Sequence, residues 1–338
     1  MLKTWVTLAC LSIAYLGGQR LNHTSWQGSS ALLEVQQNLG ESTPPHYLPY
    51  DEALVKKGEE LVKFGRTIGP NGKRTKFISK HYVCTTCHNL VQEDPDLRIS
   101  DPEARLDYAI QKGIPFLQGS TFKGIVNRES WYNDDYVKKY GDEKIEIAHK
   151  DLREAIQLCA IECSQGRPME AWEIEAVLSY YWTLQYSLDD LGLEEKDIDY
   201  LNTPSDSLQL DQKKNWLRSF YQPTSPAHFY DAPKDKKVGY PGIKGRPEKG
   251  KALYELSCLH CHKPGGVSHY ILEDNKLSFT HLAKKIEKDD HFSLYQIIAY
   301  GTYAIPGHRP YMPHYPEERL NKQQVEDLRS YIELKAGK

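Results

Sequence analysis

Four of the seven cysteines occur in two copies of one pattern, in which a histidine directly follows the second cysteine. The pattern is Cys-x-x-Cys-His, and it spans residues 84–88 and 258–262. Two thiols at this spacing can add to the two vinyl groups of a haem, while the adjacent imidazole reaches the iron from the same side. The sequence therefore predicts two covalently bound haem c groups. The residues predicted to attach and ligate them are Cys84, Cys87, His88, Cys258, Cys261 and His262.

Two other kinds of site also use cysteine pairs. A zinc site built from two pairs usually has about 15–20 residues between them, whereas these pairs begin at residues 84 and 258. A thioredoxin-like redox pair needs a strand followed by a helix, but both patterns here follow predicted helices and are trailed by loops. Both alternatives are disfavoured.

The second site has an obvious candidate for the sixth iron ligand. Met312 lies in the sequence Pro-Tyr-Met-Pro, after the second motif and shortly before a predicted closing helix. The flanking prolines argue against a helix interior, and a thioether ligand opposite the imidazole raises the reduction potential of a haem iron. Met312 is the predicted ligand. Weaker alternatives are His269, His308 and His314.

The first site is less conventional, because its nearest methionine is badly spaced. Met169 lies 11 residues before Tyr180 of the closing helix, whereas in the second half the corresponding distance is 19 residues. Cys159 and Cys163 fall at the comparable distance, which favours a thiolate ligand and Cys159 first. Residues four apart on a helix have Cβ atoms about 5–6 Å apart, while a disulfide needs about 3.8 Å. A disulfide between the two cysteines, Cys163 as ligand and Met169 as ligand all remain open.

Each half has a helix before its motif and another at its end. Asp51 is a good N-cap for a helix reaching Phe64, and its Lys-Gly-x-x-Leu segment at 57–61 recurs at 249–253. Apolar stripes at helical spacing close the two halves: Ile174, Val177, Leu178 and Tyr181, then Val325, Leu328, Tyr331 and Ile332.

These elements predict a mainly α protein with two similar domains, at residues 46–188 and 245–338. Its 338 residues suit two domains of about 100–150 residues each. Proline- and glycine-rich sequence predicts a long linker at 189–244, with one short helix around 211–221. Residues 21–45 are expected to be a spacer, and residues 66–83 a surface loop.

The start of the chain and its charge indicate where the protein acts. An apolar run from Trp5 to Leu16 is short for a membrane span and suits a signal peptide within residues 1–18, although an uncleaved anchor is an alternative. Cys10 is a poor fit to a lipidation site. The expected location is periplasmic, with the membrane reached only through that anchor. The net charge of −3 comes from intermixed residues and gives no argument for nucleic acid.

Residues 55–185 resemble the diheme thiosulfate dehydrogenases and related sulfur-oxidising cytochromes. The similarity rests on Gly65-Arg66 before a loop and the first motif, on Cys159 seven residues before Gly166-Arg167, and on the closing segment from Glu175 to Trp182. Residues 245–335 resemble a class I cytochrome c. The extra Cys163, the segment 124–131 and the long linker depart from the family pattern.

The resemblance implies two class I cytochrome c-like domains, with His/Cys ligation at the first haem and His/Met ligation at the second. Cys159 takes the position of the family's ligand cysteine, which is also implicated in handling a sulfur substrate. A cleft lined by Arg128 or Arg167 would then hold a small sulfur anion, unless these arginines serve the surface or a haem propionate.

Three functions follow from these expectations. The simplest is electron transfer between redox partner proteins, with electrons passing from the first haem to the second. The second is oxidation of a small sulfur anion at the first haem, as in a thiosulfate dehydrogenase. The third is a diheme peroxidase, which requires an open iron position.

Overall fold

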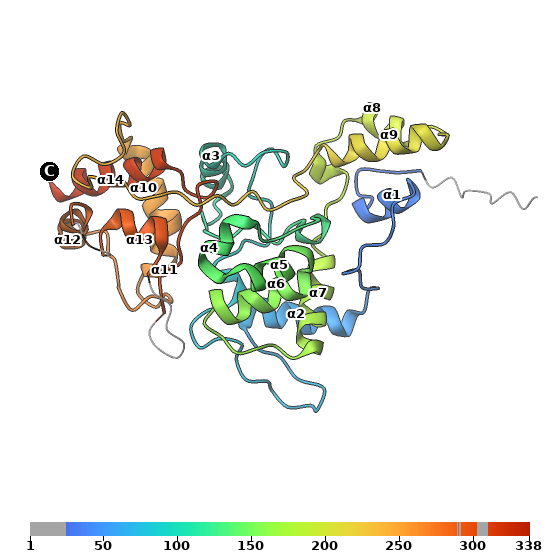
Figure 1. Ribbon diagram of the computed structural model, residues 1–338, viewed down its shortest axis with the longest axis horizontal. Coiled ribbons are helices and arrows are strands. Elements are labelled where there is room, and N and C mark those ends of the chain that lie inside the picture. The colour runs from blue at the N-terminus through green and yellow to red at the C-terminus, as the bar shows by residue number, and fades with distance from the viewer. Residues whose placement is uncertain (1–24, 289, 291, 303–309) are drawn as a thin grey trace, which may run out of the picture.

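The computed structural model describes residues 25–288, 290, 292–302 and 310–338, and these residues are mainly helical (Figure 1). Within these ranges the only extended pairings are two isolated bridges, Ala31–Ser187 and Ile68–Arg74. The predicted mainly α fold is confirmed. No helix in the described ranges is both long enough and apolar enough to cross a membrane. The predicted leader, residues 1–18, lies outside them.

The first lobe is built on the helix pair α2 (Glu52–Phe64) and α7 (Ala171–Trp182), which pack against each other. As predicted, Asp51 caps α2 by accepting a hydrogen bond from the Leu54 backbone N–H at 3.0 Å. Three further helices complete this lobe beside the pair (Figure 1): α4 (Val137–Tyr140), α5 (Asp142–Lys150) and α6 (Leu152–Leu158).

The second lobe is built on α10 (Pro247–Leu253) and α14 (Lys322–Ala336), which pack in the same way. The predicted closing stripe is confirmed, because Val325, Leu328, Tyr331 and Ile332 are all buried. The remaining helices of this lobe are α11 (Leu259–His262), α12 (Lys276–Ile286) and α13 (Leu294–Tyr300).

One glycine in each opening helix permits the close crossing. A Cβ on Gly58 would lie 1.8 Å from the Ala176 carbonyl oxygen, and a Cβ on Gly250 would lie 2.0 Å from the Asp327 carbonyl oxygen. The next contact of the added Cβ would be with the Cβ of an aromatic residue one turn further along the closing helix. This residue is Tyr180 for Gly58 and Tyr331 for Gly250. The repeated Lys-Gly-x-x-Leu segment therefore marks the same helix crossing in both lobes.

Replacing Gly58 with alanine should destabilise the first lobe. Alanine would normally favour an exposed helix by about 1 kcal/mol over glycine, but here its methyl group meets backbone and overpacking costs about 1–3 kcal/mol. We expect a net loss of stability in chemical denaturation followed by tryptophan fluorescence. Gly69→Ala is the matched control, because its Cβ would make only ordinary contacts, the nearest at 3.4 Å. Equal stability of the two variants would contradict this crossing.

The region between the predicted domains is more ordered than the sequence indicated. Where one short helix was predicted, the chain forms α8 (Glu195–Asn202) and α9 (Ser207–Arg218). The predicted spacer at 21–45 contains α1 (Leu32–Asn38), whose apolar side chains join α8 and α9 in a third hydrophobic cluster. In Figure 1 these three helices lie together at one end of the molecule. The expected linker is thus partly a packed unit, because the two segments bury each other's apolar residues.

Helix α3 (Pro102–Lys112) belongs to the first half in sequence but packs on the second lobe. Its buried Leu106 and Ala109, with Phe116 just after it, are part of the second lobe's core. Arg246 reinforces the contact by pairing with Glu103 at 2.6 Å and with Asp327 at 2.5 Å. The predicted first domain, residues 46–188, therefore contains a helix that packs in the core of the second lobe.

A buried ion pair also joins the lobes. Glu93, in the loop after the first motif, is bound by both terminal nitrogens of Arg319, and the two side chains are 1% and 3% exposed. Arg319 donates further to the Leu117 carbonyl at 2.7 Å, and Glu93 accepts from the Thr121 backbone N–H at 2.7 Å. Burial would raise the pKa of Glu93, but the Arg319 charge outweighs it and lowers that pKa to about 2.

Candidate haem sites

The first motif presents its histidine in the form that iron needs. His88 Nδ1 lies 2.6 Å from the Ser120 carbonyl oxygen. Because a carbonyl can only accept, Nδ1 carries the proton and Nε2 keeps its lone pair for a metal. Burial also lowers the pKa of His88, which favours the neutral ring. Phe122 stacks on the ring at 4.3 Å between centroids, and a Cβ on Gly119 would come within 2.5 Å of it.

The second motif repeats this arrangement. It begins at the end of a π-helical turn, Tyr254–Cys258, and continues through α11. His262 Nδ1 lies 2.7 Å from the Tyr270 carbonyl oxygen, so its Nε2 is likewise available. Burial lowers the pKa of His262 as it does that of His88.

A cavity of about 200 Å³ opens beside the first motif. Cys84, Cys87 and His88 contribute to its lining, together with Cys159, Cys163 and Met169. Most of the other lining groups are apolar or aromatic. A largely apolar space with an available imidazole and two thiols fits a haem, and all three candidates for the sixth ligand line the same space.

Cys159 and Cys163 are the first and last residues of a π-helical turn that follows α6. The turn is closed by the Ser164 N–H, which donates to the Cys159 carbonyl at 2.9 Å. Such π-bulges are frequent at functional sites. The two cysteines are free thiols in the structure.

The two thiols of this turn hydrogen-bond to each other and differ in acidity. The hydrogen bond from Cys159, with that from Tyr140 at 3.3 Å, lowers the pKa of Cys163 to about 6. The same bond and burial raise the pKa of Cys159. Of the two thiols, Cys163 is therefore the more acidic. As an iron ligand, Cys159 would serve in its thiolate form.

Met312 belongs to the second lobe, and its role as the iron ligand there stays a prediction. It packs against the second lobe's core, to which Cys258 also contributes. Its backbone is fixed by Thr302, whose N–H donates to the Met312 carbonyl at 2.8 Å and whose hydroxyl accepts from the Met312 N–H at 2.7 Å. Of the weaker alternatives, His269 is exposed and His308 lies outside the described residues. The third, His314, lines the cavity of the first site.

The two arginines considered for anion binding have different surroundings. Arg167 binds Glu173 through both terminal nitrogens, at 2.7 and 2.6 Å, and is not among the residues that line the cavity. Arg128 does line the cavity, and its Nη1 lies 3.5 Å from the Ser120 hydroxyl. Its charge contributes to lowering the pKa of His88, so it lies toward the histidine side. Arg167 is therefore a structural residue, and only Arg128 faces the site.

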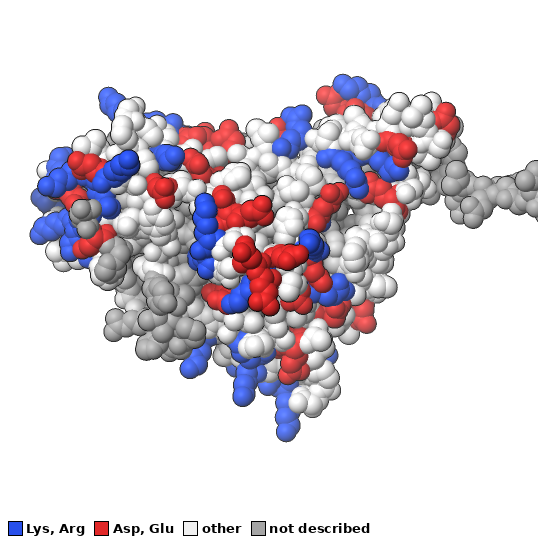
Figure 2. All heavy atoms as spheres, viewed as in Figure 1, with Lys and Arg blue, Asp and Glu red and all other residues white. Residues whose placement is uncertain are grey.

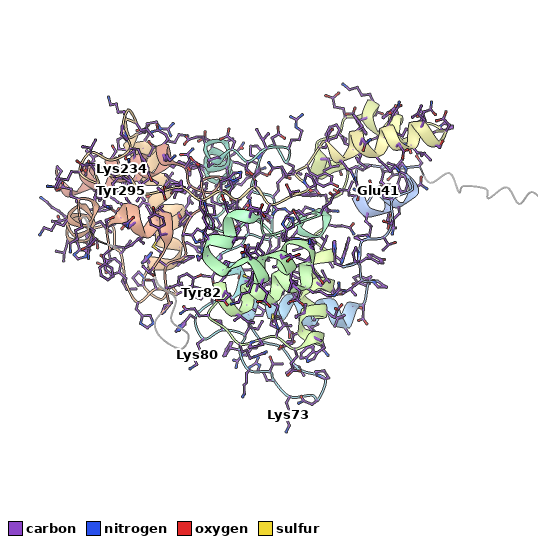
Figure 3. All side chains as sticks on the ribbon, in the orientation of Figure 1. Glu41, Lys73, Lys80, Tyr82, Lys234 and Tyr295 are labelled. Carbon is purple, nitrogen blue, oxygen red and sulfur yellow. The ribbon has the colours of Figure 1, made fainter. Side chains whose placement is uncertain are left out.

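The two motifs meet where the lobes join. His260, inside the second motif, hydrogen-bonds to the backbone of Thr86 in the first, and the Cys261 thiol contributes to raising the pKa of Cys87. Tyr82 lies at this junction (Figure 3) and donates its hydroxyl hydrogen to the Tyr311 carbonyl. Residues of the two motifs that would hold haem c thus lie next to each other across the junction.

Comparison with known families identifies one of the two halves. Residues 247–334 match the cytochrome c family. This part of the chain is a cytochrome c domain. Membership of that family implies a covalently bound haem c and electron transfer at its iron. No curated protein and no solved structure matches the chain.

Three features near the first site were missed from sequence. Tyr132, Tyr136 and Tyr140 line its cavity, and their spacing of four residues was a signal for one shared face. Lys139 lies among them, and His314 reaches the cavity from the cytochrome c domain. On the face seen in Figure 2, basic and acidic residues are interspersed. The charge pattern therefore does not single out Lys139.

Proposed function

We propose that this protein is an exported diheme cytochrome c that passes electrons between redox partner proteins. The observation that carries the proposal is the first site, which repeats the features of the identified cytochrome c domain. It has the same Cys-x-x-Cys-His motif, the same tethering of the histidine Nδ1 to a backbone carbonyl, and the same glycine crossing.

The residues that would hold the two groups are the paired motif cysteines and His88 and His262. A bound haem c supplies one-electron chemistry at its iron. Met312 raises the potential at the second site and a Cys159 thiolate lowers it at the first, so electrons run toward the second. The junction at Thr86 and His260 supports direct transfer between the two. The predicted leader supports a periplasmic location.

Low-temperature electron paramagnetic resonance of the oxidised protein tests the ligands. We expect two low-spin ferric signals, one typical of thiolate ligation and one of histidine–methionine ligation. Cys159→Ala should abolish the first and leave the second, while the matched variant Cys163→Ala should leave both. Loss of the thiolate signal in the Cys163 variant instead would make Cys163 the ligand. A wild-type spectrum without a thiolate signal would favour Met169.

A second candidate function is oxidation of a small sulfur anion at the first site. The observation favouring it is the pair of cationic side chains, Arg128 and Lys139, in a cavity that also contains two thiols. Joining two thiosulfate ions into tetrathionate forms one sulfur–sulfur bond and releases two electrons, which is one for each of two ferric haems. Adding thiosulfate to the oxidised protein should reduce the haems and yield tetrathionate. Haems that stay oxidised would exclude this function without affecting the first.

A further inference from the structure

The cavity at the first site has a polar wall made by both lobes. Lys139 comes from α4, and His314 comes from the loop before α14. Lys139 Nζ lies 2.6 Å from His314 Nδ1. Both residues line the cavity, and His314 is 8% exposed.

The short contact decides which nitrogen of the His314 imidazole carries the proton. An ammonium group can only donate, so Nδ1 of His314 must accept, and the ring proton must be on Nε2. Nε2–H is therefore a buried donor. It has no hydrogen-bond partner among the described residues.

The Lys139 ammonium group forms no ion pair with a carboxylate of the described residues. Its neighbour Lys138, in contrast, pairs with Asp135 at 3.8 Å. Glu318 shares the cavity lining, but its carboxylate accepts from the His228 backbone N–H at 3.0 Å. A cation beside a buried, unsatisfied N–H donor is suited to an anionic oxygen.

We propose that Lys139 and His314 together bind a small oxyanion on the side of the cavity where Cys163 lies. The ammonium group supplies the charge and the imidazole Nε2–H a directed hydrogen bond. The residue after Lys139, Tyr140, has its hydroxyl 3.3 Å from Cys163 Sγ. Arg128 instead contacts Ser120, whose carbonyl binds His88. This inference deepens the second candidate function by naming residues that would hold its substrate, and it rests on that function only for the identity of the anion.

Sulfate separates anion binding from oxidation, because it has the charge and oxygens of a sulfur oxyanion but gives up no electrons to ferric haem. Calorimetric titration of the oxidised holoprotein with sulfate, at constant ionic strength, should reveal one site. Lys139→Met should weaken binding by at least about 10-fold, and His314→Phe by about 2- to 10-fold. Lys138→Met should leave the affinity unchanged, since that side chain is 76% exposed. Denaturation midpoints establish that the variants are folded.

Absence of sulfate binding to the wild-type protein would overturn the proposal, as would equal affinities of the Lys139 and Lys138 variants. The oxyanion could otherwise come from a haem propionate. In that case Lys139→Met would shift the midpoint potential of the first haem, and the wild-type protein would bind no sulfate. If sulfate binds as expected but thiosulfate leaves the haems oxidised, the binding site stands and only the sulfur-oxidising function fails.

Discussion

Replacing Cys84 and Cys87 together with serine should reduce the covalent haem from two groups per chain to one. Serine hydroxyls do not form thioethers with the vinyl groups, so the first site would lose its covalent attachment. The second site would keep its own, because Cys258 and Cys261 belong to a separate cytochrome c domain at residues 247–334. Intact mass and the absorbance of denatured, solvent-extracted protein both report the number of attached groups.

The matched control is Cys159→Ser with Cys163→Ser, which removes the other two cysteines of the same cavity. This variant should keep two covalent haems, because neither cysteine belongs to an attachment motif. The complementary pair of changes at Cys258 and Cys261 should again leave one. Wild-type protein with a single covalent haem would contradict the diheme assignment, whichever motif retained it.

Replacing Arg319 with methionine should destabilise the protein by about 3–5 kcal/mol, the usual cost of removing one partner of a buried ion pair. The change leaves Glu93, whose side chain is 1% exposed, without its ion-pair partner. It also removes the hydrogen bonds to Leu117 that help to hold the lobes together. Chemical denaturation at neutral pH, followed by tryptophan fluorescence, measures the loss.

The loss should depend on pH in a defined direction. In the wild-type protein the pKa of Glu93 is lowered from 4.5 to about 2. The pair therefore stabilises the fold above about pH 4.5, and this contribution disappears as the pH falls toward 2. In the Arg319 variant, burial without the cation raises the pKa of Glu93, so acid neutralises the carboxylate and the variant's deficit shrinks. A deficit that is constant from pH 7 to pH 4 would contradict this account.

Two further variants separate the ion pair from simple loss of packing. The double change Glu93→Gln with Arg319→Met should be less destabilised than Arg319→Met alone, because glutamine leaves no buried charge. Arg98→Met should have no measurable effect, since Arg98 pairs with Asp96 on the surface and is 60% exposed. A double variant as unstable as the single one would assign the loss to packing.

The sequence alone predicted the haem-binding chemistry of this protein, because that chemistry depends on short motifs. Two thiols and an imidazole must be within five residues to serve one haem, so both motifs could be read directly. The opening helix and its Asp51 cap, and the apolar stripes of the closing helices, are also local, since helix formation depends on residues three or four apart.

Only the tertiary structure decided which segments pack together. Helix α3 carries an ordinary apolar face, and nothing in its sequence says that this face joins the second lobe. Prolines between the domains suggested an irregular linker, yet α8 and α9 form because α1, more than 150 residues earlier in the chain, covers them. Long-range packing overrides local signals here because each segment is too short to bury its own apolar side chains.

The same reason explains which parts of the first site were missed. Glu93 and Arg319 are 226 residues apart, and Lys139 and His314 are 175 apart, so no spacing rule connects either pair. His314 follows Met312 in sequence and was considered only for the second haem, yet it lines the cavity of the first site. Residue types near a motif predict a ligand set, but only the folded chain brings the two lobes together around one space.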